Sequence, residues 1–185
     1  MEKTLFAILL GGVLLNNYAL QSYLGVSTML GASRETVKAA VTGIAVTVVT
    51  VLSTLVIWPL QTFVLAPNGL EYLQTLVFVT VIVAVASLVG AAAKALCKKP
   101  LGVWFPLMAL NSAVLGVSLT NAAEGFGFLQ ALVSALAAGL GFLLAMLVFC
   151  GVRSRIEEAY VPKAFRGLPV YLMAAAILSL ALFAF

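Results

Sequence analysis

Apolar residues fall into six long runs along the chain, and short polar segments separate these runs. Each run is close to the ~20 residues that a helix needs to cross the hydrocarbon core of a bilayer. The runs cover residues 5–24, 36–58, 70–96, 101–120, 126–150 and 168–185. This pattern predicts an all-α integral membrane protein with six transmembrane helices, folded as a single polytopic membrane domain over residues 1–185.

The basic residues lie mostly on one side of the predicted helices. Nine of the ten are in or beside the first, third and fifth connections, and only Lys3 is on the other side. Cytoplasmic loops hold an excess of Lys and Arg, so these connections are predicted to face the cytoplasm. We therefore expect a multi-pass protein of the inner (cytoplasmic) membrane with both termini extracytoplasmic. The nine residues are Arg34, Lys38, Lys94, Lys98, Lys99, Arg153, Arg155, Lys163 and Arg166.

The composition agrees with a membrane protein and argues against several other classes. Hydrophobic residues make up 64% of the chain and charged residues 9%, whereas about a quarter of a soluble domain is charged. There is no His and no Asp, so a self-contained hydrolase is not expected. Cys97 and Cys150 lack the spacing of a metal or redox motif. The net charge of +4 comes without a basic run, which predicts the lipid bilayer and no nucleic acid as a partner.

Polar and small residues near or within the runs have ordinary structural roles as their first interpretation. Thr47 and Gly139, in the second and fifth runs, belong to sets of small residues that predict close helix packing. Glu71 and Glu124 lie near span ends on the predicted outer side. A solvated end charge is the usual role there, and attraction of a cation is the alternative. The N-terminal segment lacks a convincing cleavage site and is interpreted as the first helix.

A short repeat suggests that the chain is internally duplicated. The tetrapeptide Leu-Gly-Val-Ser occurs at residues 24–27 and again at 115–118, and each copy follows an Asn-containing helix. In a chain this apolar, one such match is expected by chance about once, so its placement matters more than its existence. Two halves of three spans each must enter the membrane in opposite orientations. We therefore expect two inverted three-helix repeats, at approximately residues 1–97 and 98–185.

The first and fourth predicted helices contain residues that would interrupt them near the membrane midplane. Lipid cannot satisfy freed backbone groups, so irregular backbone at this depth must be buried in protein or line a cavity. The alternative is a Pro kink, with polar side chains bonding between helices. The interrupting residues are Asn16, Asn17 and Gly25 in the first run and Pro106, Asn111 and Gly116 in the fourth.

Five segments together resemble one known family. They read Leu-Asn-Asn at 15–17, Tyr-Leu-Gly-Val at 23–26, Gly-Leu-Glu-Tyr-Leu-Gln-Thr at 69–75, Asn-Ser-Ala-Val-Leu-Gly-Val at 111–117 and Val-Pro-Lys-Ala-Phe-Arg-Gly at 161–167. In this order they resemble the RnfA subunit of the Rnf ion-translocating electron transport complexes, and its relative NqrE. The resemblance covers nearly the whole chain, including the outside location of the termini.

This resemblance implies a subunit of a ferredoxin:NAD+ oxidoreductase that couples electron transfer to Na+ or H+ translocation. Its implied partners are an RnfE-like homologue of opposite orientation and the other Rnf subunits (B, C, D and G). In the family, two cysteines from each of the two homologues hold a [2Fe-2S] cluster inside the membrane. The corresponding positions here are Ser27 and Ser112. Because serine is a harder and far more basic ligand than thiolate, the sequence predicts a weakened or absent cluster.

Two other functions remain open at this point. One is a small inverted-repeat transporter of solutes or ions, against which the lack of any Asp or deeply placed Glu argues. The other is a structural or assembly subunit that keeps the family fold but has lost the cluster, which the paired serines favour. No complete active site is expected in this chain alone.

Overall fold

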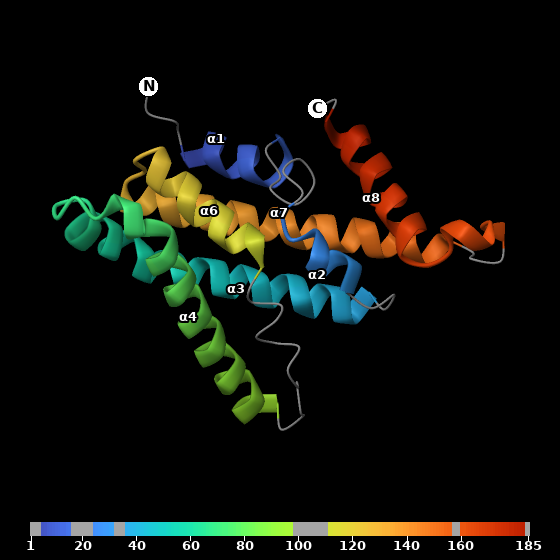
Figure 1. The fold of residues 1–185 in the computed structure, drawn as a ribbon, viewed down its shortest axis with the longest axis horizontal. Helices are drawn as coiled ribbons and strands as arrows, with labels where there is room; N and C mark the ends of the chain where they lie inside the picture. The colour runs from blue at the N-terminus through green and yellow to red at the C-terminus, as the bar shows by residue number, and fades with distance from the viewer. Residues whose placement is uncertain (1–4, 16–23, 32–35, 98–110, 157–159, 184–185) are drawn as a thin grey trace.

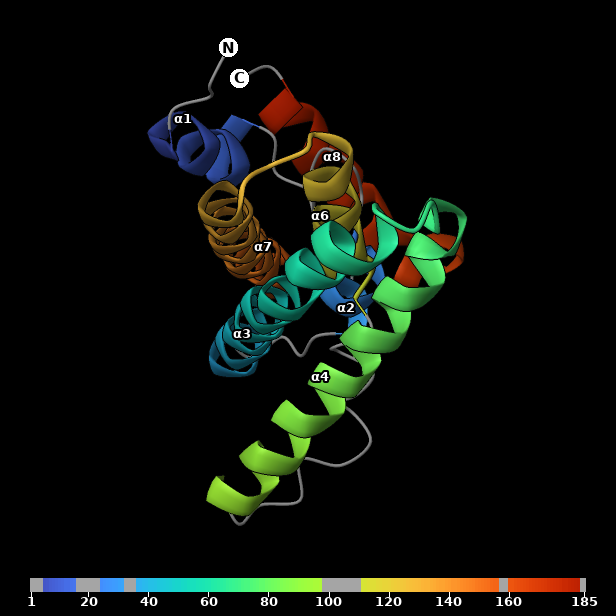
Figure 2. The same cartoon turned by 90° about the vertical axis from the view of Figure 1, so that its left-hand side faces the viewer.

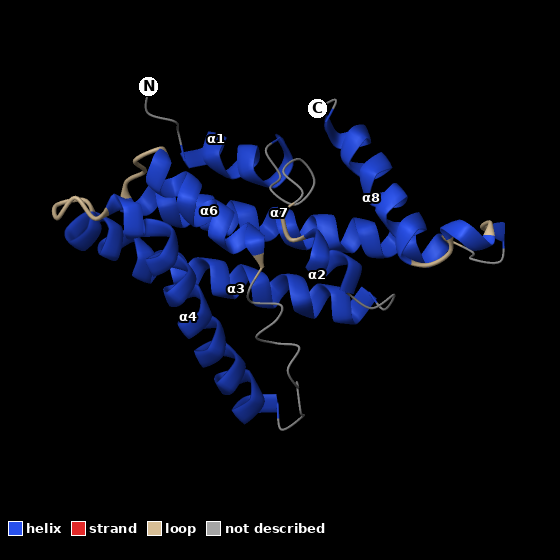
Figure 3. Cartoon of the chain, in the orientation of Figure 1, coloured by secondary structure: helices blue, strands red, loops and turns tan. Residues whose placement is uncertain are grey.

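A computed structural model describes residues 5–15, 24–31, 36–97, 111–156 and 160–183. Helices form the described part of the chain, which contains no strand (Figure 3). In chain order they are α1 (Leu5–Leu10), the π-helix η1 (Gly11–Leu15), α2 (Val26–Gly31), α3 (Thr36–Leu60), the π-helix η2 (Gln61–Leu65), the 3-10 helix η3 (Glu71–Leu73), α4 (Gln74–Cys97), α6 (Ser112–Ala123), α7 (Phe128–Arg155), the 3-10 helix η5 (Lys163–Phe165) and α8 (Leu168–Phe183).

Among the described residues, three helical stretches are long and apolar enough to cross a membrane. They are Thr36–Leu65, Glu71–Ala92 and Phe128–Arg155, and Ser112–Ala123 and Leu168–Ala181 form shorter apolar helices. The all-helical fold with several membrane-compatible apolar helices is therefore confirmed. Three of the predicted spans, 5–24, 101–120 and 168–185, include residues outside the described ranges.

The long helices α3 and α7 run antiparallel and form the centre of the fold (Figures 1 and 2). Gly43 faces Leu143, and Gly139 faces Thr47. Residue numbers therefore increase along α3 in the direction in which they decrease along α7. A Cβ at Gly139 would lie 2.6 Å from the Thr47 methyl carbon and 2.9 Å from the Thr47 Cα. The missing side chain thus lets the two backbones approach closely, and the predicted packing role of these small residues is confirmed.

The core extends from this pair to the neighbouring helices. Phe78 of α4, Val114 of α6 and Phe142, Met146 and Phe149 of α7 are almost completely buried. The α1–η1 segment lies along α7, and α6 lies between α3, α4 and α7. Figures 1 and 2 show α4 leaving this group at a steep angle. Apolar contacts on α4 are accordingly concentrated on one side of the helix, at residues such as Phe78, while large side chains elsewhere on it are exposed.

Candidate functional site

Residues from the two predicted helix interruptions meet in the structure. The Gly25 backbone N–H donates a hydrogen bond to the Ser112 Oγ over 2.8 Å, although 87 residues separate them in sequence. Beside this bond, the Leu24 side chain fills the space that a Cβ at Gly116 would need. The turn before α2 and the beginning of α6 therefore form one contact, which we call the break contact and define by Leu24, Gly25, Asn111, Ser112 and Gly116.

Gly25 is held at this contact by its backbone geometry and by its neighbours. Its φ of 82° lies in the left-handed region, which glycine adopts without steric cost. A Cβ would lie 2.7 Å from the Phe142 Cε2 atom and would overlap the Asn111 side chain. No larger residue fits there without displacing one of these two side chains.

Asn111 sets the beginning of α6. Its Oδ1 atom accepts a hydrogen bond from the Ala113 backbone N–H at 3.0 Å, which is the usual arrangement of an asparagine N-cap. The residue is only 3% exposed, and its Nδ2 atom has no hydrogen-bond partner among the described residues. Within the described residues, α6 therefore begins directly after Asn111, which belongs to the predicted interruption of the fourth apolar run.

The other predicted site residues take the following places. Ser27 lies in the first turn of α2 and Ser112 is the first residue of α6, and both are exposed. Ser27 follows Gly25 by two residues, so its Cα is within about 12 Å of the Ser112 Oγ. Gly116 lies inside α6. The remaining three, Asn16, Asn17 and Pro106, lie outside the described residues.

A family model described as "Rnf-Nqr subunit, membrane protein" matches residues 5–185. The chain belongs to the Rnf-Nqr family. The resemblance noted from the sequence motifs is thereby confirmed over almost the whole length.

Curated relatives agree with this family assignment. The A subunit of the ion-translocating oxidoreductase complex of Syntrophotalea carbinolica is 40% identical over 99% of this chain and 96% of its own length. The A subunit of the Na(+)-translocating ferredoxin:NAD(+) oxidoreductase complex of Acetobacterium woodii is 36% identical over 98% of this chain and 96% of its own length. The corresponding protein of Edwardsiella ictaluri is 38% identical over 96% and 94%, respectively. The similarity thus extends from end to end in these proteins.

In this Rnf-Nqr chain the break contact does not fit an iron–sulfur cluster. The Ser112 Oγ already accepts the Gly25 N–H, and neither serine can supply a soft thiolate. Within the described ranges there is no group of three or more His, Cys, Asp or Glu residues that could hold a metal. Cys150 is buried in α7 and Cys97 is the last residue of α4, so both belong to other helices.

Proposed function

We propose that this chain is the RnfA-type membrane component of an Rnf complex, a ferredoxin:NAD+ oxidoreductase that couples electron transfer to Na+ or H+ translocation. The observation that carries the proposal is the end-to-end similarity, at 36–40% identity, to two proteins named as the A subunits of ion-translocating oxidoreductase complexes. The chain supplies no complete set of catalytic groups, so the oxidoreductase activity belongs to the assembled complex.

The proposed architecture is six transmembrane helices arranged as two inverted repeats of three. The break contact supports it, because Leu24 from one copy of the Leu-Gly-Val-Ser tetrapeptide packs on Gly116 from the other. Contacts between corresponding segments of two halves are expected where the halves meet at a pseudo-twofold axis. The one-sided distribution of basic residues supports an inner-membrane location with both termini extracytoplasmic.

The proposed direct partner is an RnfE-like homologue of opposite orientation, with the B, C, D and G subunits completing the complex. Ser27 and Ser112 are both exposed in the single chain, as a site completed by a second subunit requires. The large exposed apolar side chains of α4, such as Leu76 and Leu88, supply further surface for lipid or for this partner.

Co-purification and activity test this proposal together. An affinity-tagged chain, expressed with the other Rnf subunits, is expected to retain the RnfE-like protein through purification, and the membranes should reduce NAD+ with reduced ferredoxin. Deleting the gene of this chain should abolish that activity, and the unmodified gene should restore it. Retention of full activity in the deletion strain would refute the proposal.

For the cofactor, we propose that the cluster is absent or labile because two of its four thiolate ligands are replaced by serine. Serine is nearly isosteric with cysteine, so the substitutions Ser27→Cys and Ser112→Cys should leave the fold intact. The unmodified complex is expected to show no intramembrane two-iron signal by electron paramagnetic resonance, and the double variant should gain one when the partner's cysteines are present.

A matched control for this experiment is the pair Ser27→Cys and Ser118→Cys. Ser118 is the serine of the second tetrapeptide copy, and six residues of helix place it about 9 Å along α6 from Ser112. This pair should produce no cluster signal. A strong signal from the unmodified complex, or an equal gain in the control pair, would contradict the assignment of Ser27 and Ser112.

A second candidate function is an assembly subunit that keeps the fold without carrying electrons. The observation that favours it is the hydrogen bond between Ser112 and Gly25, which gives this serine a structural role. Iron and sulfide content of the purified complex separates the two functions: a subunit that still carries electrons through a labile cluster contributes iron shared with its homologue, whereas an assembly subunit contributes none.

A further inference from the structure

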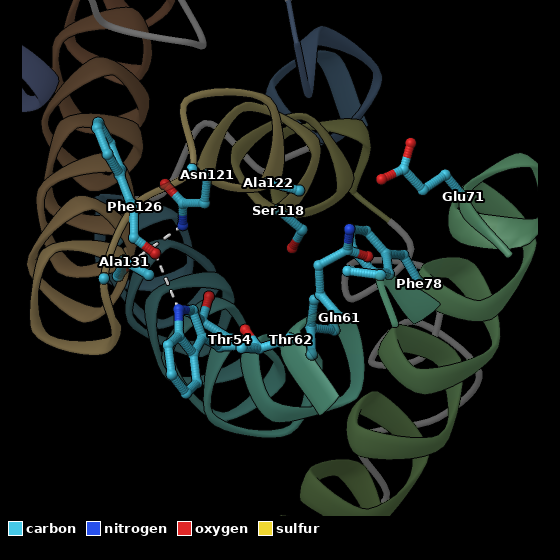
Figure 4. Close-up of a pocket in the computed structure, with 15 residues that line it drawn as sticks. Thr54, Gln61, Thr62, Glu71, Phe78, Ser118, Asn121, Ala122, Phe126 and Ala131 are labelled. Atoms are coloured by element: carbon cyan, nitrogen blue, oxygen red, sulfur yellow. Dashed lines mark hydrogen bonds between the residues drawn. The ribbon is translucent and has the colours of Figure 1, made fainter. Parts of the chain in front are cut away.

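A pocket of about 390 Å³ lies at the other end of α6 from the break contact. It is enclosed by the ends of α3 and α6, the beginnings of α4 and α7, and the π-helix η2 (Figure 4). Sites that hold a small ligand usually have a volume of at least about 300 Å³, so a long side chain also fits here. The lining residues that are exposed, and therefore form its mouth, are Thr62, Ala66, Glu71, Gly125 and Gly127.

Trp58 gives the pocket an aromatic surface that is already fixed in place. The residue lines the pocket and is only partly buried. Its indole N–H donates to the Phe126 carbonyl oxygen at 2.9 Å. Edge contacts with Phe63 and Phe128, at 6.2 Å and 5.2 Å between ring centroids, also hold the ring. A ligand that packs on this ring therefore does not have to order it first, which lowers the cost of binding.

The charge at the mouth of the pocket is negative. Glu71 is the one carboxylate among the described lining residues, which include no Lys, Arg or His. The residue is exposed, and Figure 4 shows its carboxylate extending from η3 toward the α6 side of the pocket. A charge of one sign at a concave site attracts ligands of the opposite sign. The pocket therefore favours a positively charged group over an anion.

The neutral polar groups of the wall do not form a coordination shell for a free ion. The Asn121 Oδ1 and Gln61 Oε1 atoms are buried beneath the pocket wall. The Thr54 and Ser118 hydroxyls donate to carbonyl oxygens of their own helices at 2.9 Å. The Gln61 amide nitrogen can only donate, and the Thr62 hydroxyl can donate or accept. A hard cation needs several oxygens around it, so these groups suit a positive charge that is delivered on a larger ligand.

From this arrangement we infer that the pocket receives a basic side chain of a neighbouring subunit, whose charge pairs with Glu71 and whose stem packs on Trp58. Arginine fits best, because a guanidinium binds a carboxylate through two parallel N–H groups and stacks on aromatic rings. Within an assembled complex such a group is present at an effective concentration of about millimolar or more, so it needs fewer contacts than a free ion. The inference names a subunit contact and rests on the proposed function for the identity of the neighbour.

Photo-cross-linking in the purified complex tests which molecule occupies the pocket. A benzophenone amino acid in place of Thr62, at the exposed mouth, should cross-link to another subunit, at a segment that contains Arg or Lys. Digestion with a protease that does not cleave at basic residues identifies this segment. The same amino acid in place of Asn68 is the matched control, since Asn68 is exposed and bonds to the Val64 carbonyl oxygen outside the pocket wall. It should not give this product.

Charge reversal tests whether Glu71 supports the contact. We expect Glu71→Lys to retain at most about a tenth of the cross-linked subunit during purification, because like charges at an interface repel. Glu71→Gln should lose less, and the difference from the unmodified complex should shrink as salt is added. Glu124→Lys is the matched control: Glu124 is an exposed carboxylate at the end of α6 that does not line the pocket. It should retain all subunits.

A charge swap completes the test. Changing the basic residue of the cross-linked segment to Glu should restore retention in the Glu71→Lys variant. Equal retention in the Glu71→Lys and Glu124→Lys variants would overturn the inference. So would a cross-link from Thr62 to lipid alone, or to a protein segment without a basic residue.

The outcomes also separate this inference from the proposed function. A complex that reduces NAD+ with ferredoxin and keeps every subunit in the Glu71→Lys variant refutes the pocket contact and leaves the proposed function standing. A cross-link from Thr62 to a basic segment of a protein other than an Rnf subunit, with retention that depends on Glu71, does the reverse.

Discussion

The two ends of α6 carry the same residue type in opposite chemical states. At the beginning, Asn111 uses its oxygen to cap the helix and leaves its amide donor without a partner among the described residues. Near the end, Asn121 uses its amide donor and leaves its oxygen. These leftover groups match the helix polarity, which is positive at the N-terminus and negative at the C-terminus. Among the described residues, this helix thus has a buried amide donor without a partner near its beginning and a buried amide oxygen without a partner near its end, about 15 Å apart.

The largest expected effect concerns which side of the membrane the pocket end of α6 faces. A periplasmic reporter fused after Phe185, or inserted between Glu124 and Gly125, should be active, and one inserted near Lys99 should be inactive. The response is all-or-none because Lys and Arg set the orientation of the whole chain. A cytoplasmic reporter provides the reciprocal control. Activity of the periplasmic reporter at Lys99 would place the two ends of α6 the other way round.

Next in size is a glycine substitution at the break contact. Gly25→Ala should destabilise the protein by about 3 kcal/mol, which combines the cost of a left-handed non-glycine residue with overpacking against Asn111 and Phe142. Gly125→Ala is the matched control at the pocket end, since Gly125 has a φ of 62° but open space around its Cβ position. It should cost only about 1 kcal/mol.

Thermal unfolding of the purified complex in detergent measures both glycine variants. Equal losses of stability would mean that backbone conformation alone explains the effect at Gly25. In that case the close packing of the break contact would not contribute to the stability of the protein.

The smallest effect distinguishes the two asparagines. Asn111→Ala removes the N-cap of α6 and should lower the stability by about 1 kcal/mol in any salt. Asn121→Ala removes the hydrogen bond to the Ala131 carbonyl oxygen but also a buried oxygen that has no partner among the described residues, so its cost should be smaller. Unfolding temperatures of the two variants and of the unmodified complex in the same buffer give this comparison. Equal losses of stability in the two variants would remove the distinction between the two ends.

Much of the fold was predictable because long apolar runs specify helices locally. The predicted runs 36–58 and 126–150 correspond to α3 and α7, and the packing role of Thr47 and Gly139 followed from residue size. The turn at Gly25 and the beginning of α6 after Asn111 were also expected from residue type, since glycine and a capping asparagine each act on the adjacent backbone. Gly116, in contrast, continues the helix.

The pocket could not be predicted, because it depends on contacts between distant segments. Gln61 and Asn121 come from different helices, and single polar residues near the ends of apolar runs carry no periodic signal. Among these polar residues, only Glu71 carries a charge that indicates a possible interaction with cations. Phe142 was missed at the break contact for a similar reason: nothing in a continuous apolar run indicates which aromatic ring will close over a glycine on another helix.

The antiparallel pairing of α3 and α7 has a consequence for motion. These helices come from different halves of the chain, and Gly43 and Gly139 each hold a side chain of the opposite helix in van der Waals contact. Sliding one helix past the other would displace Leu143 from the space beside Gly43 and Thr47 from the space beside Gly139. Close-packed interfaces resist such continuous deformation. The two halves should therefore move as one body. Any change in the access of ions during turnover would then fall to the less tightly packed α4 and to the contacts with neighbouring subunits.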